Sequence, residues 1–410
     1  MKSLQRAPGW SVVLAEGSPS ERYGAQGRSG RGELGAALDA LLQLPFVPER
    51  LPRGLGRLVL RGISSVLGRC YRHWHRDALD PFWREALDGL AAGLGLSKSQ
   101  VYGLNAIELE SSHFGFTPGC SSLGFAGSQT ESGRPKLAYN HDFPPAFRPF
   151  AMIRRSDPTH GLRSLALTYP VLLGAVAGVN EAGLAVSLNH AFAADIRRRK
   201  PGRFLTMLLQ ECLERARSTQ EAVDTVLRTE TLSGGILTFV DASGDRAAIE
   251  ISATRKSVRR PERNEVLWSV NQYFSKEMPA VEVPVGSLSR GVISGVDIHA
   301  CNVSRSARLP RLLTRDKYGD RDIVNISSDH DGSSGNSLTV CRHDDPLSET
   351  LFNAILDPTT RTIDVCRGNP CRNRRETFHL TGEPSAVRSG ARPSRSQGST
   401  QRHGASSQSG

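Results

Sequence analysis

The sequence predicts a mixed α+β fold in which helices pack outside stacked antiparallel sheets. Apolar residues recur at helical spacing from about residue 36 to residue 118, whereas from 120 to about 192 their period falls towards two. A helical pair and further short apolar runs follow. This order is typical of a layered α+β protein, and a chain of 410 residues that is 38% hydrophobic can bury a sizeable core.

Residues 36–118 show an apolar helix face and a capping pattern that marks the start of a helix. One face of a predicted helix carries the apolar residues Phe82, Ala86, Leu87, Leu90 and Leu94. Ser97 with Gln100 forms a capping-box pattern, in which each side chain bonds the other residue's backbone amide, and so begins a second helix. Later in the chain, Ser218 with Glu221 predicts the start of another helix by the same pattern.

The strand-like part consists of short apolar runs separated by glycine-containing turns. It begins with CSSLGFAG at Cys120 and continues through GVNEAGLAVSLN. Four later segments also predict strands: residues 236–252, 265–274, 337–343 and 350–368.

Both ends of the chain are rich in Gly, Ser and Arg. Residues 1–34 and 382–410 therefore predict disordered tails, because such a composition offers little to bury.

Charge and cysteine content narrow the classes of protein. The formal net charge is +11, but no basic helix or aromatic-basic pattern accompanies it, so a specific nucleic-acid partner is not predicted. Seven cysteines without disulfide-type spacing favour a reducing compartment. No apolar run has the length of a signal peptide core or of a membrane span, and we expect a cytoplasmic protein without membrane contact.

Cys120 stands where the helical pattern changes to the strand pattern. The segment TPGCSSLGFAG places a turn of small residues directly before a cysteine that would begin a strand. An inert buried thiol is a common alternative for a single cysteine. Polar residues recur downstream, however, in the blocks YNHDF, GVNEAGLAVSLN, VNQYFS and SRSARLPRLL.

Together these blocks resemble the cysteine N-terminal-nucleophile (Ntn) hydrolases of the acyl-coenzyme A:6-aminopenicillanic acid acyltransferase type, whose layout is shared by the choloylglycine hydrolases. The resemblance runs from about Phe82 to Gly368. It implies a four-layer αββα sandwich of two antiparallel sheets flanked by helices. It also implies a helical pro-segment at residues 35–119 that becomes the small subunit, and a catalytic region at residues 120–381.

The same resemblance implies a role for individual residues. Cys120 would be the nucleophile, released when the Gly119–Cys120 peptide bond is cut, and Asp142 would orient the new α-amino group and the thiolate. Asn189 and Asn271 match positions that donate to the oxyanion, and Arg305 matches the arginine that steadies the terminal cysteine.

Two positions depart from the family pattern. Tyr139 stands where many relatives have arginine, and Gln272 follows Asn271 where many have histidine. Tyr139 and its neighbour Asn140 are therefore predicted to bind and orient substrate.

The chemistry of a terminal cysteine supports these roles. A thiol with a pKa of about 8.5 is a weak nucleophile at neutral pH, whereas an α-amino group with a pKa of about 7.7 is a usable base. One residue that carries both groups needs no histidine. Side-chain amides that donate to the developing oxyanion would each contribute about 3 kcal/mol.

Structural interpretations remain open for the same side chains. Asn180 with Gly183 is typical of a hairpin turn, Asn189 of a strand end and Asp142 of a turn cap, and Arg305 could lie on the solvated start of a helix.

The predicted function is an autoprocessed hydrolase or acyltransferase. It would act on amide or thioester bonds of acylated amines, peptides or secondary metabolites through a thioester acyl-enzyme, and the two fragments would stay associated. The basic residues 197–199 would suit an acyl-coenzyme A donor. Two alternatives stay open: a non-catalytic binding or scaffold relative, and a papain-like hydrolase that pairs its cysteine with His141 or His190.

No metal and no bound cofactor are predicted. DHDGSSGN at 329–336 and RHDD at 342–345 lack the spacing of a calcium loop, and Cys366 with Cys371 lacks a second ligand pair for zinc. No glycine-rich phosphate loop of standard spacing occurs, which argues against a nucleotide-dependent enzyme.

Overall fold

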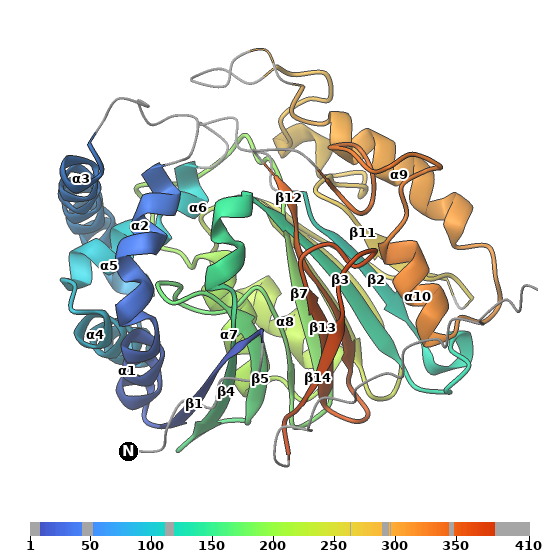
Figure 1. Cartoon of the computed structure of the whole chain (residues 1–410), viewed down its shortest axis with the longest axis horizontal. Coiled ribbons are helices and arrows are strands. Elements are labelled where there is room, and N and C mark those ends of the chain that lie inside the picture. Colours follow the sequence, from blue (N-terminus) through green and yellow to red (C-terminus); the bar gives the residue numbers. More distant parts are fainter. Residues whose placement is uncertain are drawn as a thin grey trace, which may run out of the picture.

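Two β-sheets stack at the centre of the molecule and helices cover them from outside (Figure 1). The computed structural model describes residues 9–42, 52–110, 119–262, 264–288, 295, 297–343 and 348–381.

The first sheet has eight strands in the order β1-β4-β5-β6-β7-β8-β9-β10. Its neighbours pair antiparallel, except that β1 runs parallel to β4. The strands are β1 (Ser11–Gly17), β4 (Met152–Pro158), β5 (Ser164–Thr168), β6 (Ala177–Asn180), β7 (Leu184–His190), β8 (Gly235–Asp241), β9 (Arg246–Ile251) and β10 (Lys256–Arg259).

The second sheet has six strands in the order β11-β2-β3-β12-β13-β14, and all of its neighbours are antiparallel. The strands are β2 (Ser121–Phe125), β3 (Lys136–Phe143), β11 (Leu267–Ser269), β12 (Glu349–Asp357), β13 (Thr362–Arg367) and β14 (Arg375–His379).

The main core lies between the two sheets. Leu137 of β3 and Phe352 of β12 pack there against Leu167 of β5 and Val179 of β6, and Cys120 belongs to the same buried cluster. Side chains alternate along a strand, so each sheet sends every second residue into this core and the others towards the outer helices.

One helical pair covers the outer face of each sheet. α7 (Leu205–Arg215) and α8 (Thr219–Arg228) pack on the eight-stranded sheet, and α9 (Ala300–Leu312) and α10 (Asp320–Ser327) pack on the six-stranded sheet. Figure 1 shows α9 and α10, in orange, on the side of the molecule opposite the N-terminal helices. The layers are helix, sheet, sheet and helix, which confirms the predicted αββα sandwich.

The N-terminal helices pack against one another and against the start of α7. They are α1 (Pro19–Gly30), α2 (Leu34–Leu42), α3 (Arg53–Trp74), α4 (Pro81–Leu94), α5 (Lys98–Asn105) and α6 (Ile107–Glu110). Short 3₁₀ segments lie at Arg31–Glu33, Arg76–Ala78, Gly127–Gln129, Pro145–Phe150 and Pro279–Val281. None of the helices in the described part of the chain has the length and apolar character that crossing a membrane requires.

The prediction that residues 1–34 form a disordered tail is wrong for the described residues from Gly9 onward. β1 pairs with β4, and α1 begins with a capping box at Ser18 and Glu21. The backbone of α1 lies directly against α4 at Gly27. A Cβ on Gly27 would lie only 2.7 Å from the carbonyl oxygen of Leu90 on α4. Glycine here permits close packing of α1 on α4, so its abundance in this segment does not indicate disorder.

Several other sequence expectations have a definite outcome. The starts of α5 and α8 are capped at Ser97 and Ser218 as predicted. Residues 337–343 form turns and bends instead of a strand, and 265–274 contributes only the short β11. The predicted C-terminal tail, 382–410, lies outside the described residues.

Candidate active site

Cys120 lies directly before β2, in the core between the sheets, and is fully buried. β2 is flanked by β11 and β3 in its own sheet, and it also contacts β7 and β8 of the other sheet. The sequence therefore places the thiol at a rigid position, because strand pairing fixes the backbone on both sides.

Two polar side chains hold the backbone of Cys120. Its N–H donates to Asn271 Oδ1 at 2.6 Å, and Arg305 Nη1 donates to its carbonyl oxygen at 2.6 Å. Arg305 Nη2 also donates to Asn271 Oδ1 at 2.9 Å. Since both partners of that atom are donors, it must be the amide oxygen, and the amide nitrogen donates to the carbonyl oxygen of His190.

Arg305 lies on the buried face of α9 and is completely inaccessible to solvent. The interpretation of this residue as a solvated helix start therefore does not hold. A buried guanidinium requires acceptors around it, and Cys120, Asn271 and Asn302 supply them.

Asp142 lies beside the backbone that precedes the thiol. Its Oδ2 is 3.8 Å from Arg305 Nη1, and Thr350 Oγ1 donates to its Oδ1 at 2.7 Å. A Cβ on Gly119 would approach Asp142 Oδ2 to 3.0 Å and Arg342 Nη1 to 2.2 Å. The side chains of Asp142 and Arg342 thus lie directly against Gly119, and a larger residue there would have to displace the Arg342 guanidinium.

The thiol contacts two aromatic side chains of β3. Tyr139 Oη lies 3.5 Å from Cys120 Sγ, and His141 Nδ1 lies 3.8 Å from it. Burial, together with the charge of Asp142, raises the pKa of the Cys120 thiol to about 11, although the hydrogen bond from Tyr139 acts in the opposite direction. Burial lowers the pKa of His141 to about 3 and that of His190 to about 4, so both imidazoles are neutral at neutral pH.

Asn189 lies near this centre without contacting Cys120 in any hydrogen bond of the described residues. Its Oδ1 accepts from Ser122 Oγ at 2.6 Å, and its Nδ2 makes a long bond of 3.4 Å to the carbonyl oxygen of Ser269. The flanking carbonyl oxygens, of Leu188 and His190, accept from Tyr139 and Asn271 of the site.

Asn140 and Asn180 have structural partners. Asn140 lies on the opposite face of β3 from Tyr139 and His141, and its Nδ2 donates to the carbonyl oxygens of Ser327 and Val340. The structure therefore separates Asn140 from the thiol, whereas it places Tyr139 against it. Asn180 closes the turn between β6 and β7 by accepting from Leu184 N–H, as the hairpin interpretation predicted.

The basic segment at 197–199 is engaged with the N-terminal helices. His75 Nε2 lies 2.8 Å from the carbonyl oxygen of Arg198, and the guanidinium of Arg199 lies over the ring of Trp74 at 5.2 Å.

Two side chains of the site, Thr350 and Arg342, have no sign in the sequence, whereas the papain-like alternative named His141, which does lie beside the thiol. Thr350 faces Asp142 because β12 pairs with β3 in that register. Such a register joins residues about two hundred positions apart, and no local pattern carries a signal of it. Away from this centre, the described residues contain one group that could hold a metal ion, formed by His330, Cys341, His343 and Cys371.

More than half of the chain matches one known protein family. The sequence profile of the family described as acyl-coenzyme A:6-aminopenicillanic acid acyl-transferase matches residues 129–372, a segment that begins after Cys120. No curated protein matches the chain in sequence.

Solved structures with a similar arrangement include three hydrolases. An ortholog of N-acylethanolamine-hydrolyzing acid amidase from Caenorhabditis elegans is 16% identical, with a TM-score of 0.40, and the match covers 58% of this chain and 93% of that chain. Penicillin V acylase from Agrobacterium tumefaciens is 15% identical with a TM-score of 0.37, covering 63% and 86%. Conjugated bile acid hydrolase from Clostridium perfringens is 11% identical with a TM-score of 0.38, covering 65% and 100%.

Proposed function

The chain belongs to the acyl-coenzyme A:6-aminopenicillanic acid acyl-transferase family, as its sequence blocks predicted, and we propose that it is a self-processing Ntn amidohydrolase or acyltransferase. It cuts itself between Gly119 and Cys120 and then uses Cys120 as its nucleophile. Residues 35–119 are then the pro-segment, and residues 120–381 the catalytic region.

One observation carries the proposal: the backbone N–H of Cys120 donates to Asn271 Oδ1 at 2.6 Å while the thiol of the same residue is buried between the sheets. After cleavage that N–H would become the α-amino group. Asn271 would then hold the base beside the sulfur, and Arg305 on the carbonyl oxygen would fix the other end of the residue.

Processing would begin with attack of Cys120 Sγ on the carbonyl carbon of Gly119. The C–N bond of the Gly119–Cys120 peptide breaks, a Gly119–S thioester forms, and the nitrogen of Cys120 becomes a free amine. Water then hydrolyses the thioester, which leaves a carboxylate on Gly119 and a thiol on Cys120. Asp142 and Arg342 enclose Gly119 and would hold its carbonyl group in place during both steps.

Turnover by the processed enzyme would use the new amine as the base. The amine takes the thiol proton, the thiolate attacks the acyl carbonyl carbon of the substrate, and the protonated amine returns the proton to the leaving group. The acyl group then remains on Sγ as a thioester. Water would release it as a carboxylic acid, whereas an acceptor amine would release it as a new amide.

The contacts of the two asparagines suggest different tasks for them. Both ends of the Asn271 amide are bonded, to Cys120 and to His190, so we assign it the positioning of the nucleophile. Asn189 keeps the proposed oxyanion role, because among the described residues its amide nitrogen makes only the long bond to Ser269 and can turn towards a developing negative charge.

The substrate is proposed to carry an apolar acyl group. The partly buried rings of Phe143, Phe147 and Tyr169 pack against the core cluster that contains Cys120, and His141 next to the thiol stacks on Phe143. Such rings favour a hydrocarbon or aromatic acyl chain. An acyl-coenzyme A thioester would be a suitable donor, and an amine or acylated amine the second substrate.

The papain-like alternative would make His141 the base. Its position, 3.8 Å from the sulfur, suits that role, but a pKa of about 3 leaves it a poor acceptor for the proton of a thiol with a pKa of about 11. A terminal amine is better matched to the task.

Intact mass spectrometry of the purified protein tests the proposal. We expect two fragments, of 119 and 291 residues (410 minus 119), with the larger one beginning at Cys120, and we expect Cys120→Ala to remain whole. Cys301→Ala is a suitable control, because this buried cysteine lies on α9 outside the set of residues that touch the thiol. A wild-type chain that stays intact and inactive would favour the non-catalytic alternative, and an intact but active chain would favour the papain-like one.

A further inference from the structure

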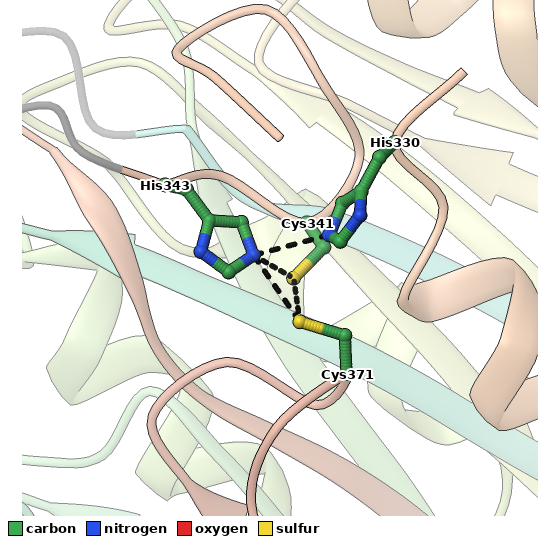
Figure 2. A group of neighbouring side chains, drawn as sticks. All are labelled: His330, Cys341, His343 and Cys371. Atoms are coloured by element: carbon green, nitrogen blue, oxygen red, sulfur yellow. Dashed lines mark hydrogen bonds between the residues drawn. The ribbon is translucent and has the colours of Figure 1, made fainter. Parts of the chain in front are cut away.

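Four side chains from three separate segments converge on one point, away from Cys120. Figure 2 shows His330, Cys341, His343 and Cys371 with their ligand atoms turned towards one another. The four atoms, two ring nitrogens and two sulfurs, all lie within 4.8 Å of one another. His343 Nε2 is 3.0 Å from His330 Nε2, 3.3 Å from Cys341 Sγ and 3.2 Å from Cys371 Sγ, and the two sulfurs are 3.8 Å apart.

We propose that His330, Cys341, His343 and Cys371 form a closed, structural zinc site that ties the segment 330–343 to the turn that carries Cys371. This inference does not depend on the proposed function, because the side chains that contact the thiol of Cys120, Tyr139 and His141, are not among the four ligands.

The spacing of the four atoms fits a single tetrahedral ion. Zinc bonds of about 2.3 Å to sulfur and about 2.05 Å to nitrogen place two sulfurs about 3.8 Å apart, sulfur and nitrogen about 3.5 Å apart, and two nitrogens about 3.3 Å apart. Four of the six distances, those from His343 Nε2 to the other three atoms and that between the two sulfurs, agree with these edges within a few tenths of an ångström. The two distances from His330 to the sulfurs lie within 4.8 Å. Small shifts of the side chains would therefore complete the coordination.

The chemistry of the donors selects the metal. Two thiolates and two imidazoles in a tetrahedron are typical of zinc, whereas calcium and magnesium require oxygen ligands. A two-iron cluster with two cysteines and two histidines would need the cysteine pair and the histidine pair on different irons. Here His343 contacts both sulfurs directly, which fits one ion shared by all four.

Gly335 contributes to the shape of the site. It has a φ of +97°, and a Cβ at this position would lie 2.4 Å from His343 Cδ2 and 3.2 Å from His330 Cδ2. The turn therefore needs a glycine for its backbone conformation and also to leave room for both imidazole rings.

The site borders residues that enclose Gly119. Arg342 lies between the ligands Cys341 and His343; its N–H donates to Thr350 Oγ1 at 3.0 Å, and its carbonyl oxygen accepts from Asn369 Nδ2 at 2.6 Å. Thr350 in turn bonds Asp142. Because Cys341 and His343 flank Arg342 in the chain, a metal ion bound to both would fix the backbone of Arg342 and keep its guanidinium beside Gly119. Arg342 would then act as a positioning residue for Gly119.

The sequence contained the ligands without showing their partnership. His330 and His343 lie in the segments DHDGSSGN and RHDD, which lack the spacing of a calcium loop, and Cys366 is the cysteine nearest to Cys371 in sequence. In the structure the Cys366 thiol donates to the carbonyl oxygen of Gly368, and Cys371 meets Cys341 instead. The sequence predicts no metal, whereas this arrangement of side chains supports the proposed zinc site.

Zinc content and cobalt spectroscopy on the full chain test the site. We expect about one zinc per chain by elemental analysis after purification without chelators, and we expect Co²⁺ added to the metal-stripped protein to give the visible bands of a tetrahedral site together with thiolate-to-cobalt absorption. Cys371→Ser and His330→Asn should each weaken zinc retention against a chelator by at least about 100-fold, since even outer-shell changes cost 10 to 100-fold. Cys371 is exposed, so this variant disturbs little of the core.

A variant outside the cluster serves as the matched control. Cys70→Ser removes a thiol on α3, outside the cluster, and should keep the zinc and the cobalt spectrum. Failure of the wild-type chain to bind added Zn²⁺ or Co²⁺, or isolation of a Cys341–Cys371 disulfide in its place, would overturn the proposal. Equal zinc retention by wild type and Cys371→Ser would also overturn it. Each readout is independent of cleavage at Gly119, so failure here and failure of the proposed function are distinguishable.

Discussion

At the position of Cys120, burial opposes the reaction that this residue is proposed to perform. Its pKa of about 11 leaves about one thiol in ten thousand ionised at pH 7. The α-amino group that cleavage would release becomes cationic when it takes the thiol proton, and its charge, on the same residue, would stabilise the thiolate. Processing would therefore convert an inert core thiol into a reactive one.

The pH dependence of self-cleavage follows from the raised pKa of the intact thiol. We expect the rate of fragment formation in freshly made precursor to rise about tenfold per pH unit from pH 6 to pH 9, because the thiolate fraction rises in that proportion until the pH reaches about 11. Time courses on denaturing gels at several pH values measure this rate. A rate that is flat over this range would show that the thiolate fraction does not limit the attack on Gly119.

The two-fold contact made by Arg305 sets a second expectation. Arg305→Lys should slow processing by about tenfold or more, because a single ammonium group cannot contact the Cys120 carbonyl oxygen and Asn271 Oδ1 at once. Arg311→Ala, an exposed position on the same helix, is the control and should process at the wild-type rate. Equal rates in Arg305→Lys and wild type would remove Arg305 from the proposed site.

At the scale of one element, the start of α7 depends on a carboxylate from another helix. Its N-cap residue, Phe204, has no side-chain cap, and Glu108 of α6 accepts from Leu205 N–H and from Ser233 instead. Burial raises the pKa of Glu108 from 4.5 to about 7 in spite of these bonds. The folded protein therefore holds a proton there that the unfolded chain releases at lower pH.

This proton makes stability depend on pH with a defined sign. The contribution of Glu108 is complete below pH 4.5 and is lost as pH rises through about 7, a change of about 3 kcal/mol. Relative to Glu108→Gln, the chain with Glu108 should lose about 2 to 3 kcal/mol of unfolding free energy between pH 5 and pH 8. Urea unfolding in the Cys120→Ala background measures the difference on unbroken chains.

Glu85→Gln is the control for this comparison, because Glu85 is exposed on α4. It should leave the pH dependence unchanged. If Glu108→Gln and the parent show parallel curves from pH 5 to pH 8, Glu108 is already ionised in the folded protein at pH 5.

At the scale of the whole molecule, the segment before Cys120 is built into the sandwich. β1 extends the eight-stranded sheet, α1 packs against α4, and Arg22 of α1 forms a buried ion pair with Glu214 of α7 at 2.7 Å. A fragment that supplies a strand and a buried charge should remain bound after cleavage, which supports the proposed association of the two fragments.

Removal of the Arg22 side chain tests this association. Arg22→Ala leaves the Glu214 carboxylate buried without its cationic partner, at a cost of about 3 to 5 kcal/mol. We expect the two fragments of the wild type to co-elute on size exclusion, and those of Arg22→Ala to separate at a lower urea concentration. Arg28→Ala, exposed on the same helix, should behave as wild type. Fragments that part without denaturant in the wild type would contradict the idea.

Features that depend on neighbours in sequence were predictable. The capping pairs at Ser97 and Ser218 satisfy amides three residues away, and the stripe from Phe82 to Leu94 lies on one helical face. The turn at Asn180 and the layered α+β architecture follow from patterns of the same short range. Residues 9–34, for which a disordered tail is predicted, also carry a local pattern that indicates a helix, the capping box at Ser18 and Glu21.

By itself, the sequence determined the layered fold, the family and the set of residues around Cys120 that deserve attention. Only the tertiary structure decided that Asn271 accepts from the cysteine backbone, that Thr350 and Arg342 reach Asp142 and Gly119, and that Cys371 meets Cys341. The physical reason is that hydrogen bonds and metal ligands depend on strand register and helix docking between distant segments. Local composition carries no record of which distant segments come together.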